Sequence, residues 1–309
     1  MTKITLLSPE TEKRGGWGTY TLELKKNLEA RGHLVTLHKV AATLGKRDLY
    51  LPLKEDFDRG DLTIACCAYY CPRLNPDIII AHGTYALWKP YPLGRFLESR
   101  AMRNTRVIAC SGFTHDRLLQ QGIPSEVMIH PIDINRWVYK QRKKADSFIS
   151  VSRLVNRKGI DLAIRALAKT DFKEYLIVGD GSEIAKLKRL AESLGMADRI
   201  KFLGWVPHEE LQEYYNRADV YIQPNRITGH KFEGLGISFM EAQACGLPCI
   251  TTPNGGQASA VLNEKTGYIT DNLKNAILDM KTNIPILSKN ARRWAEENNW
   301  DDYIHKLLV

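Results

Sequence analysis

The chain has 309 residues, of which 44% are hydrophobic and 26% charged. This is typical of a soluble globular protein with two domains of about 150 residues each. It has no apolar run of membrane-spanning length and no signal-peptide pattern at Met1–Glu10, so we expect a cytoplasmic protein, with peripheral membrane contact left open. The net charge of +9 lies mostly in residues 1–140, but no aromatic and basic motif accompanies it, which argues against nucleic acid as a partner.

The first half of the chain alternates predicted strands with helical segments. A strand at Lys3–Leu7 leads through the glycine-rich turn R-G-G-W-G-T-Y, which contains Gly16, into a helix over about Thr19–Arg31. This order is that of a Rossmann-like domain, in which backbone N–H groups of the loop can approach a phosphate. The spacing is not the full dinucleotide fingerprint, so a nicotinamide-dependent dehydrogenase fits poorly. Further strands are predicted at residues 33–40, Leu62–Cys66, Asp77–Ala81, Arg106–Cys110 and Val127–Ile129.

The composition changes at Trp137–Asp146, W-V-Y-K-Q-R-K-K-A-D, which is basic and lacks periodicity. We therefore predict one Rossmann-like domain over residues 1–140 and a second over residues 141–309. The second half repeats the alternation of strands and helices, which indicates another parallel sheet, and its final segment reads as helices. Its predicted strands are Ser147–Val151, Tyr175–Val178, Ile200–Leu203, Val220–Gln223 and Cys249–Thr251.

The most informative stretch is E-G-L-G-I-S-F-M-E-A-Q-A-C-G-L-P-C, which starts at Glu233. Ser238 with Glu241 three residues later predicts a capping box and a helix to about Ala244. The exposed N–H groups between the two glutamates form an anion site. A glycosidase carboxylate pair fits less well, because eight helical residues span about 12 Å and such pairs need about 5 to 9.5 Å. The loop could shorten that distance, so we favour a nucleotide sugar held at both ends and leave the hydrolase open.

Three further motifs suit phosphate chemistry. S-R-L-V-N-R-K-G brings Arg153, Arg157 and Lys158 ahead of a helix, where they can clamp a diphosphate. Singly, such residues are more often solvated surface charges. V-G-D-G-S-E places Gly179 at a strand end, and F-L-G-W-V-P presents Trp205 and Val206, which can face a base.

In this order and spacing, these motifs and the E-x7-E element from Glu233 to Glu241 resemble the retaining, nucleotide-sugar-dependent glycosyltransferases of the GT-B fold, family 4. The resemblance covers nearly the whole chain. It implies an α/β protein with two Rossmann-like domains facing each other across a cleft, the first for the acceptor and the second for the donor. It also implies a hexosyltransferase that moves a sugar from a UDP- or GDP-sugar to a hydroxyl acceptor without a further cofactor or an obligatory metal.

The resemblance implies a role for each matching residue. Glu241 would bind the ribose hydroxyls, and Glu233 would lie beside the transferred sugar. Arg153 and Lys158 would hold the diphosphate and stabilise it as the leaving group. His82, which follows a predicted strand, would lie near the sugar. The other implied donor-binding residues are Gly16, Gly234, Leu235, Gly236 and Ile237.

The acceptor is a glycan, a lipid or a small molecule, and the sequence does not choose between them. Residues 92–106 carry four arginines beside apolar residues, which suits an anionic membrane surface, although we favour a solvated helix face. The segment before Glu233 is longer than the family pattern, so Arg226, His230 and Lys231 would form a rim on the sugar site. Two alternatives stay open: a non-catalytic nucleotide-sugar or glycan-binding protein, and a nucleotide-sugar epimerase.

Overall fold

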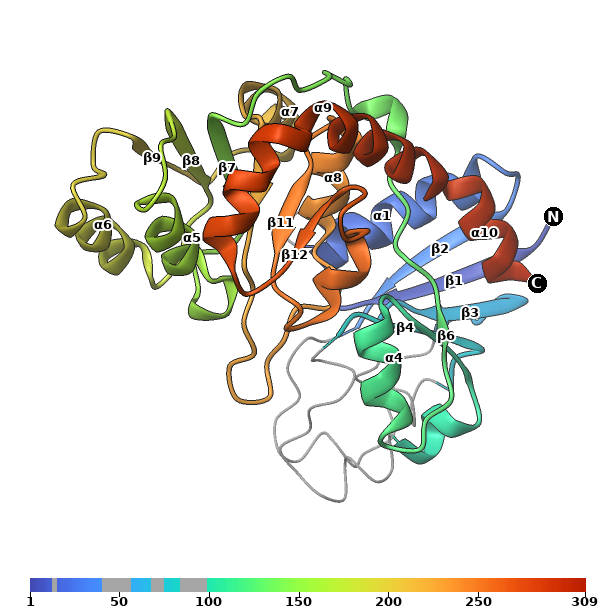
Figure 1. Cartoon of the computed structure of the whole chain (residues 1–309). Helices are drawn as coiled ribbons and strands as arrows, with labels where there is room; N and C mark the ends of the chain where they lie inside the picture. Colours follow the sequence, from blue (N-terminus) through green and yellow to red (C-terminus); the bar gives the residue numbers. More distant parts are fainter. Residues whose placement is uncertain (13–15, 41–56, 68–74, 84–98) are drawn as a thin grey trace. The chain divides into compact units, whose positions relative to one another are not determined.

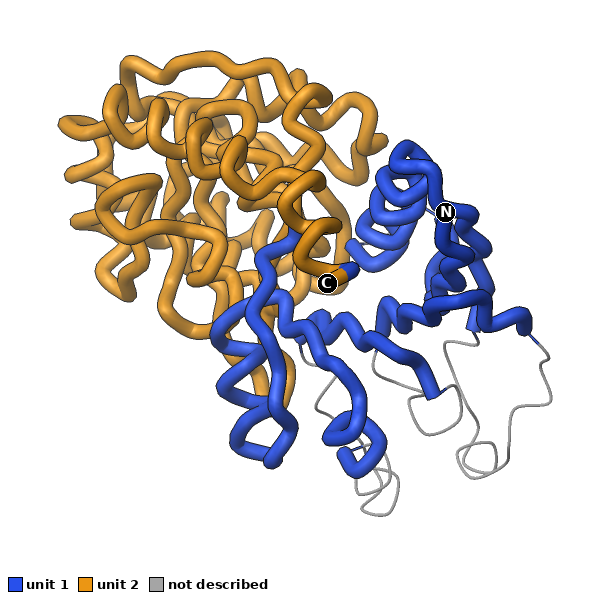
Figure 2. The backbone as a smooth tube through the Cα atoms, turned by 90° about the vertical axis from the view of Figure 1, so that its right-hand side faces the viewer, with its two compact units in different colours: residues 1–130, 308 blue, residues 131–307, 309 orange. Residues whose placement is uncertain are grey.

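The computed structural model describes residues 1–12, 16–40, 57–67, 75–83 and 99–309 (Figure 1). The chain divides into two compact units, residues 1–130 with Leu308 and residues 131–307 with Val309 (Figure 2). The division lies before the boundary that we expected at residue 140, because the basic segment there packs within the second unit. In that segment the Arg142 amide donates to Ser288 Oγ at 2.9 Å and the Lys140 amide donates to the Cys245 carbonyl at 3.2 Å.

Unit 1 is built on a parallel six-stranded sheet in the order β2-β1-β3-β4-β5-β6. The inner strands β3, β4 and β5 read as short apolar runs, and β4 is buried at every position, as expected for parallel strands covered on both faces. The strand order reverses between β1 and β3, and open α/β sheets bind ligands beyond the carboxyl ends of strands at such a point. The described elements are β1 Lys3–Ser8, α1 Gly16–Glu29, β2 Leu34–Lys39, β3 Leu62–Ala65, β4 Ile78–Ala81, β5 Arg106–Ala109, α4 Gly112–Leu119 and β6 Glu126–Val127.

Unit 2 carries a second parallel six-stranded sheet, in the order β12-β11-β10-β7-β8-β9. This is the strand order of a Rossmann fold, and it reverses between β7 and β10. The elements are β7 Ser147–Val151, α5 Ile160–Leu167, β8 Glu174–Val178, α6 Ile184–Ser193, β9 Ile200–Gly204, α7 Leu211–Arg217, β10 Val220–Ile222, α8 Ile237–Ala244, β11 Cys249–Thr251, β12 Gly267–Ile269, α9 Leu273–Glu297 and α10 Trp300–Leu308.

The helices of unit 2 bury apolar faces against this sheet. In α5 the buried residues Ile160, Ala163, Ile164 and Leu167 recur at helical spacing, so they lie on one face and join the core formed with β7, β8 and β10. In contrast, α8 is buried at every position after Ile237. None of the helices in the described ranges has both the length and the hydropathy needed to cross a membrane.

The expected α/β fold with two parallel sheets is confirmed, and all six strands predicted in unit 1 occur with small shifts at their ends. In unit 2 the prediction missed β12, which is only three residues long and begins at Gly267. Such a short segment has neither an apolar run nor an alternation that marks it as a strand. The two final helices, α9 and α10, agree with the helical segment predicted at the end of the chain.

Two loops of unit 2 approach each other closely at the glycine that precedes α5, and a substitution there tests this approach. Gly159 has φ +67°, and a Cβ there would lie 1.9 Å from the Pro224 carbonyl oxygen. We expect Gly159→Ala to lower the free energy of unfolding by about 3 kcal/mol or more, through backbone strain and a forced loop displacement. Gly195 has the same φ with open space around it, so Gly195→Ala should cost about 1 kcal/mol. Equal losses in urea denaturation would contradict the close approach.

Candidate functional site

A buried ion-pair cluster lies beyond the carboxyl ends of β7 and β10, where the strand order of unit 2 reverses. The loop after β7 supplies Arg157 and Lys158, and the loop after β10 supplies Glu233. Lys158 Nζ and Arg157 Nη1 each lie 2.5 Å from the same oxygen, Oε2 of Glu233. The side chains of Lys158 and Glu233 are 9% and 13% exposed. Two cations and one carboxylate therefore share a site that is largely withdrawn from water.

The charges of this cluster depend on one another. Burial alone would raise the pKa of Glu233, but the charges and hydrogen bonds of Lys158 and Arg157 outweigh it and lower the pKa to about 2. Burial lowers the pKa of Lys158, and the charge of Glu233 opposes that change. Glu233 is thus a carboxylate at neutral pH, and removal of either cation would leave a buried charge with less compensation.

The loop from Glu233 to Gly236 leads directly into α8. Gly236 has a left-handed backbone with φ +78° and is followed by the first helical residue, Ile237, and no side chain of the described residues caps the helix. Gly234 and Leu235 are buried in this loop. The N-terminus of α8 therefore keeps backbone N–H groups that no side chain in the described ranges satisfies, next to the ion-pair cluster.

The capping box predicted at Ser238 and Glu241 is wrong. Ser238 lies inside α8, and its hydroxyl pairs with the Tyr221 hydroxyl at 2.8 Å, because the side chain faces β10 and not the helix start. Glu241 is 3% exposed and binds two side chains from outside the helix. His208 Nε2 lies 2.8 Å from one carboxylate oxygen, and the Tyr215 hydroxyl donates to the other at 2.9 Å.

The other predicted residues of unit 2 lie nearby in the fold but contribute unequally. Arg153 is exposed and acts on Lys158 only through its charge, so it does not join the ion pair with Glu233. Gly179 follows β8, and its amide donates to the Gly204 carbonyl at 2.7 Å. Trp205 is 69% exposed and Val206 is partly buried, so the indole is open to a partner.

The extended segment before Glu233 differs from the expected rim. Arg226 donates to both carboxylate oxygens of Asp161 at 2.7 and 2.8 Å and to Asn156 Oδ1 at 2.9 Å. Its guanidinium is therefore committed to α5 and to the loop before it, which is a correction to the rim that we expected. His230 and Lys231 are exposed.

In unit 1, the predicted residues Gly16 and His82 lie in different surroundings. Gly16 is the exposed first residue of α1. His82 follows β4, and its ring lies 4.9 Å from the Tyr20 ring and 4.7 Å from the His130 ring, between centroids. His130 is 6% exposed, and the Nε2 atoms of both histidines are buried without a hydrogen-bond partner among the described residues.

The basic segment at residues 92–106 is described only from residue 99, so Arg95 lies outside the described residues. Arg103 donates to the carbonyls of Gln121 and Gly122, each at 3.0 Å, and Arg106 pairs with Glu126 at 2.9 Å. The side chains of these two arginines therefore bind other residues of unit 1.

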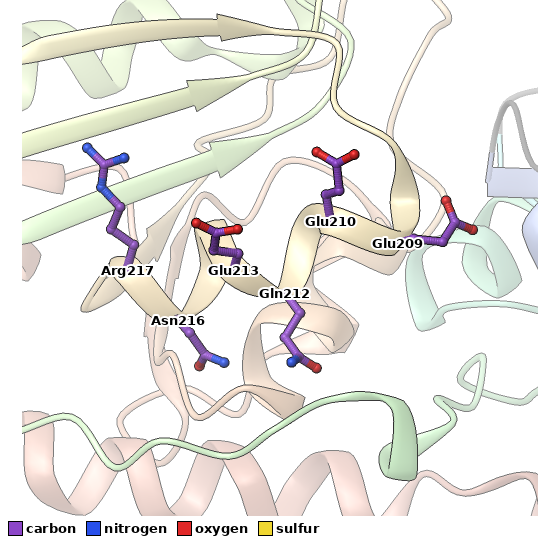
Figure 3. Close-up of a pocket in the computed structure, with 6 residues that line it drawn as sticks. All are labelled: Glu209, Glu210, Gln212, Glu213, Asn216 and Arg217. Carbon is purple, nitrogen blue, oxygen red and sulfur yellow. The ribbon is translucent and has the colours of Figure 1, made fainter.

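A hollow of about 650 Å³ lies in unit 2, along α7 and the turn before it (Figure 3). None of the predicted site residues lines it. Its lining carries three carboxylates and one guanidinium, and that guanidinium pairs with Glu174 at 2.7 Å, so the hollow is a poor match for a diphosphate. It is lined by Glu209, Glu210, Gln212, Glu213, Asn216 and Arg217. Among the described residues, no group of three or more His, Cys, Asp or Glu side chains is placed to hold a metal ion.

Sequence reasoning missed three residues of these arrangements. It placed Arg157 with Arg153 and Lys158 in the clamp, whereas the resemblance implied only Arg153 and Lys158. His208 was quoted in a motif without a role, and Tyr215 and His130 were not singled out. The basic motif itself carried the signal for Arg157, whereas the other three are recognised only by contacts with residues far away in the sequence.

Comparisons with known proteins agree on one group of enzymes. The sequence matches the family described as glycosyl transferases group 1 over residues 131–299. It is similar to a GDP-mannose-dependent alpha-(1-6)-phosphatidylinositol monomannoside mannosyltransferase of Mycolicibacterium smegmatis, with 32% identity over 211 residues that cover 62% of this chain and 55% of that protein. It is also similar to the amylovoran biosynthesis glycosyltransferase AmsK of Erwinia amylovora, with 26% identity over 54% of this chain and 44% of that protein. The chain thus spans about half the length of the curated relatives that it matches.

Solved structures resemble the chain over almost its whole length. Anabaena Alr3699/HepE in complex with UDP has a TM-score of 0.75 at 18% identity and covers 99% of this chain and 98% of its own. Sucrose-phosphate synthase from Thermosynechococcus elongatus has a TM-score of 0.78 at 20% identity and covers 99% and 97%. At these identities the likeness shows the fold, and it confirms the GT-B class that we expected.

The histidine pair of unit 1 predicts a pH dependence of stability. Burial lowers the pKa of His82 to about 3 and that of His130 well below its usual value, where the neighbouring His82 adds to the effect. Below about pH 6.5 the unfolded chain binds protons that the folded chain does not, so stability is full above that pH and falls as the pH drops. In urea denaturation between pH 7.5 and 5.5, we expect His130→Gln to reduce this slope by up to about 1.4 kcal/mol per pH unit.

The control is His115→Gln, on α4 of the same unit, where a partly exposed imidazole bonds to Ser125 Oγ at 2.9 Å. This variant should keep the wild-type slope. A His130→Gln protein with the wild-type slope would show that the pair binds protons in the folded state.

Proposed function

Since this chain belongs to the glycosyl transferases group 1 family, we propose that it transfers a sugar from a nucleotide-diphosphate sugar to a hydroxyl acceptor with retention of anomeric configuration. The observation that carries the proposal is the cluster of Arg157, Lys158 and Glu233 beside the uncapped N-terminus of α8. A donor of this class has a dianionic diphosphate joined to a polyhydroxylated sugar. The cluster offers cations and backbone N–H groups for the first and a carboxylate for the second.

Lys158 and Arg157 are suited to stabilise the leaving group. Breaking the bond between the anomeric carbon and the phosphate oxygen puts negative charge on the diphosphate, and cations already in place stabilise that charge without reorganisation. In the structure both cations pair with the single carboxylate of Glu233. A bound diphosphate would share them with Glu233, and exposed Arg153 would add a third positive charge.

Glu233 is suited to the opposite charge. Because its pKa is lowered to about 2, it is ionised when positive charge develops on the anomeric carbon. We propose that the acceptor hydroxyl attacks from the face that the phosphate leaves. A new bond from the acceptor oxygen to the anomeric carbon then replaces the bond to phosphate, and the leaving phosphate oxygen takes the hydroxyl proton. Such a path requires no covalent protein nucleophile.

The remaining donor contacts follow from the same arrangement. We propose that Glu241 binds the ribose hydroxyls, that Trp205 and Val206 lie against the base, and that the buried Gly234 and Leu235 bring backbone close to the donor. Gly179, Gly236 and Ile237 would complete the donor contacts. Because the basic side chains supply positive charge at the diphosphate, we propose that the reaction needs no obligatory metal ion.

The names of the relatives support the proposed classes of donor and acceptor. One relative is named for GDP-mannose and a phosphatidylinositol mannoside acceptor, and one structure contains UDP. We therefore propose a GDP- or UDP-sugar as donor and a glycan, a lipid or a small hydroxyl compound as acceptor. Unit 1 would bind the acceptor, and peripheral contact with a membrane would follow if that acceptor is a lipid.

Binding of a nucleoside diphosphate is the first test. Calorimetric titration with UDP, GDP and ADP, without metal and then with Mg²⁺, should show binding of one diphosphate in the absence of metal. Arg157→Ala should weaken that binding about 10- to 100-fold, because it removes a charge-assisted contact. Absence of binding to all three would contradict the function. Binding without any sugar transfer would instead favour a non-catalytic nucleotide-sugar-binding protein.

Steady-state kinetics test the leaving-group role. We expect Lys158→Ala to lower kcat about 10²- to 10³-fold with a smaller change in the donor KM, since the charge of Lys158 counts most when the phosphate departs. Lys169→Ala is the matched control, because Lys169 is an exposed lysine of the same unit and should keep wild-type kinetics. A Lys158→Ala enzyme that changed only KM would assign the lysine to ground-state binding.

A further inference from the structure

We propose that His208 and Tyr215 position the carboxylate of Glu241 so that it accepts hydrogen bonds from both hydroxyls of the donor's ribose. The inference rests on the proposed function, because it takes a ribose-containing donor as given. It adds two positioning residues to the donor site, and both act through Glu241.

Glu241 is hydrogen-bonded at both carboxylate oxygens. His208 Nε2 lies 2.8 Å from Oε1, and the Tyr215 hydroxyl donates to Oε2 at 2.9 Å. Glu241 is nearly inaccessible and Tyr215 is fully buried. The last torsion of a glutamate side chain is otherwise broad, and hydrogen bonds to an ionised carboxylate are stronger than neutral ones. Two such bonds therefore fix the plane of this carboxylate before a ligand arrives.

The number of acceptor sites left on Glu241 matches a diol. An ionised carboxylate has about four lone-pair sites, two on each oxygen. His208 and Tyr215 each occupy one site on a different oxygen, so one site remains on each. Two neighbouring hydroxyls, as in ribose, can donate to the two oxygens of one carboxylate, whereas a single hydroxyl would use only one of them.

Each partner is suited to act as a donor. Burial, and then the charge of Glu241, hold the pKa of Tyr215 well above its usual value, so the phenol keeps the proton that it donates. Nδ1 of His208 is buried and has no hydrogen-bond partner in the part of the chain that the structure describes. The contact with Glu241 is therefore the hydrogen bond that orients this imidazole, and the tautomer with the proton on Nε2 is inferred from it.

One segment at the start of unit 2 holds both donors in place. The Trp137 ring meets the His208 ring at 5.8 Å and the Tyr215 ring at 5.7 Å between centroids, both edge to face. Arg136 donates to the His208 carbonyl at 2.9 Å, and Arg142 donates to the Tyr215 carbonyl at 3.1 Å. The ring and the backbone of each donor are thus both constrained, so the carboxylate is preorganised and not merely buried.

The test compares a ribose ligand with one that lacks the diol. Calorimetry on the full chain would use UDP, GDP or ADP, whichever the wild type binds, together with its 2′,3′-dideoxy analogue. We expect the wild type to bind the ribose form about 10- to 100-fold more tightly. Tyr215→Phe and His208→Ala should each reduce this ratio at least about threefold and leave the affinity for the dideoxy form unchanged. His208→Gln, which keeps an N–H donor, should restore most of the ratio.

The matched control is Tyr214→Phe, because Tyr214 precedes Tyr215 on α7 and its hydroxyl bonds to none of the described residues. It should keep the wild-type ratio. Equal weakening of both ligands by Tyr215→Phe and His208→Ala would indicate a general structural role and overturn the inference. If Glu241→Gln lowers the ratio while those two variants do not, the proposed function stands and the inference fails. If the wild type binds no nucleoside diphosphate, both fail.

Discussion

A carboxylate that is withdrawn from water must be neutralised by cations close to it, and in this protein Glu233 meets that requirement through Lys158 and Arg157. The three residues come from two loops at the point where the strand order of unit 2 reverses. For the loops to meet there, the backbone must turn tightly after Lys158, where a side chain at Gly159 would collide with the Pro224 carbonyl. The cations can therefore reach the carboxylate only if these two loops approach each other closely.

The two glutamates of the E-x7-E element are held in different ways. Glu233 is paired with full charges, and these same charges are the groups suited to a diphosphate. Its surroundings would therefore change when a donor binds. Glu241 is held by an imidazole and a phenol that belong to the interior of unit 2, so its surroundings can stay the same. In the proposed donor site, the contacts of Glu233 would change when the donor binds, whereas those of Glu241 would stay the same.

The sequence predicted the sheets well because parallel strands covered on both faces read as apolar runs, as β4 and most of β8 do. The prediction failed where a side chain is bound by a residue that is distant in the sequence. A capping box was expected at Ser238, but the Tyr221 hydroxyl binds that side chain, and a local pattern contains no information about such a distant competitor. The ion pair of Arg157 with Glu233 was not predicted for the same reason, because it joins residues that are distant in the sequence. The roles of His208 and Tyr215 likewise depend on tertiary contacts.

The packing of Trp137 also affects how such proteins could exchange domains during evolution or in the laboratory. The indole and its neighbours Arg136 and Arg142 belong to unit 2 by their contacts, although the change in composition suggests a junction after residue 140. A chimaera joined at that residue would combine the indole of one parent with the imidazole and phenol of the other. A chimaera joined after His130 would take all three rings from the same parent. Rings that pack against one another would then stay together.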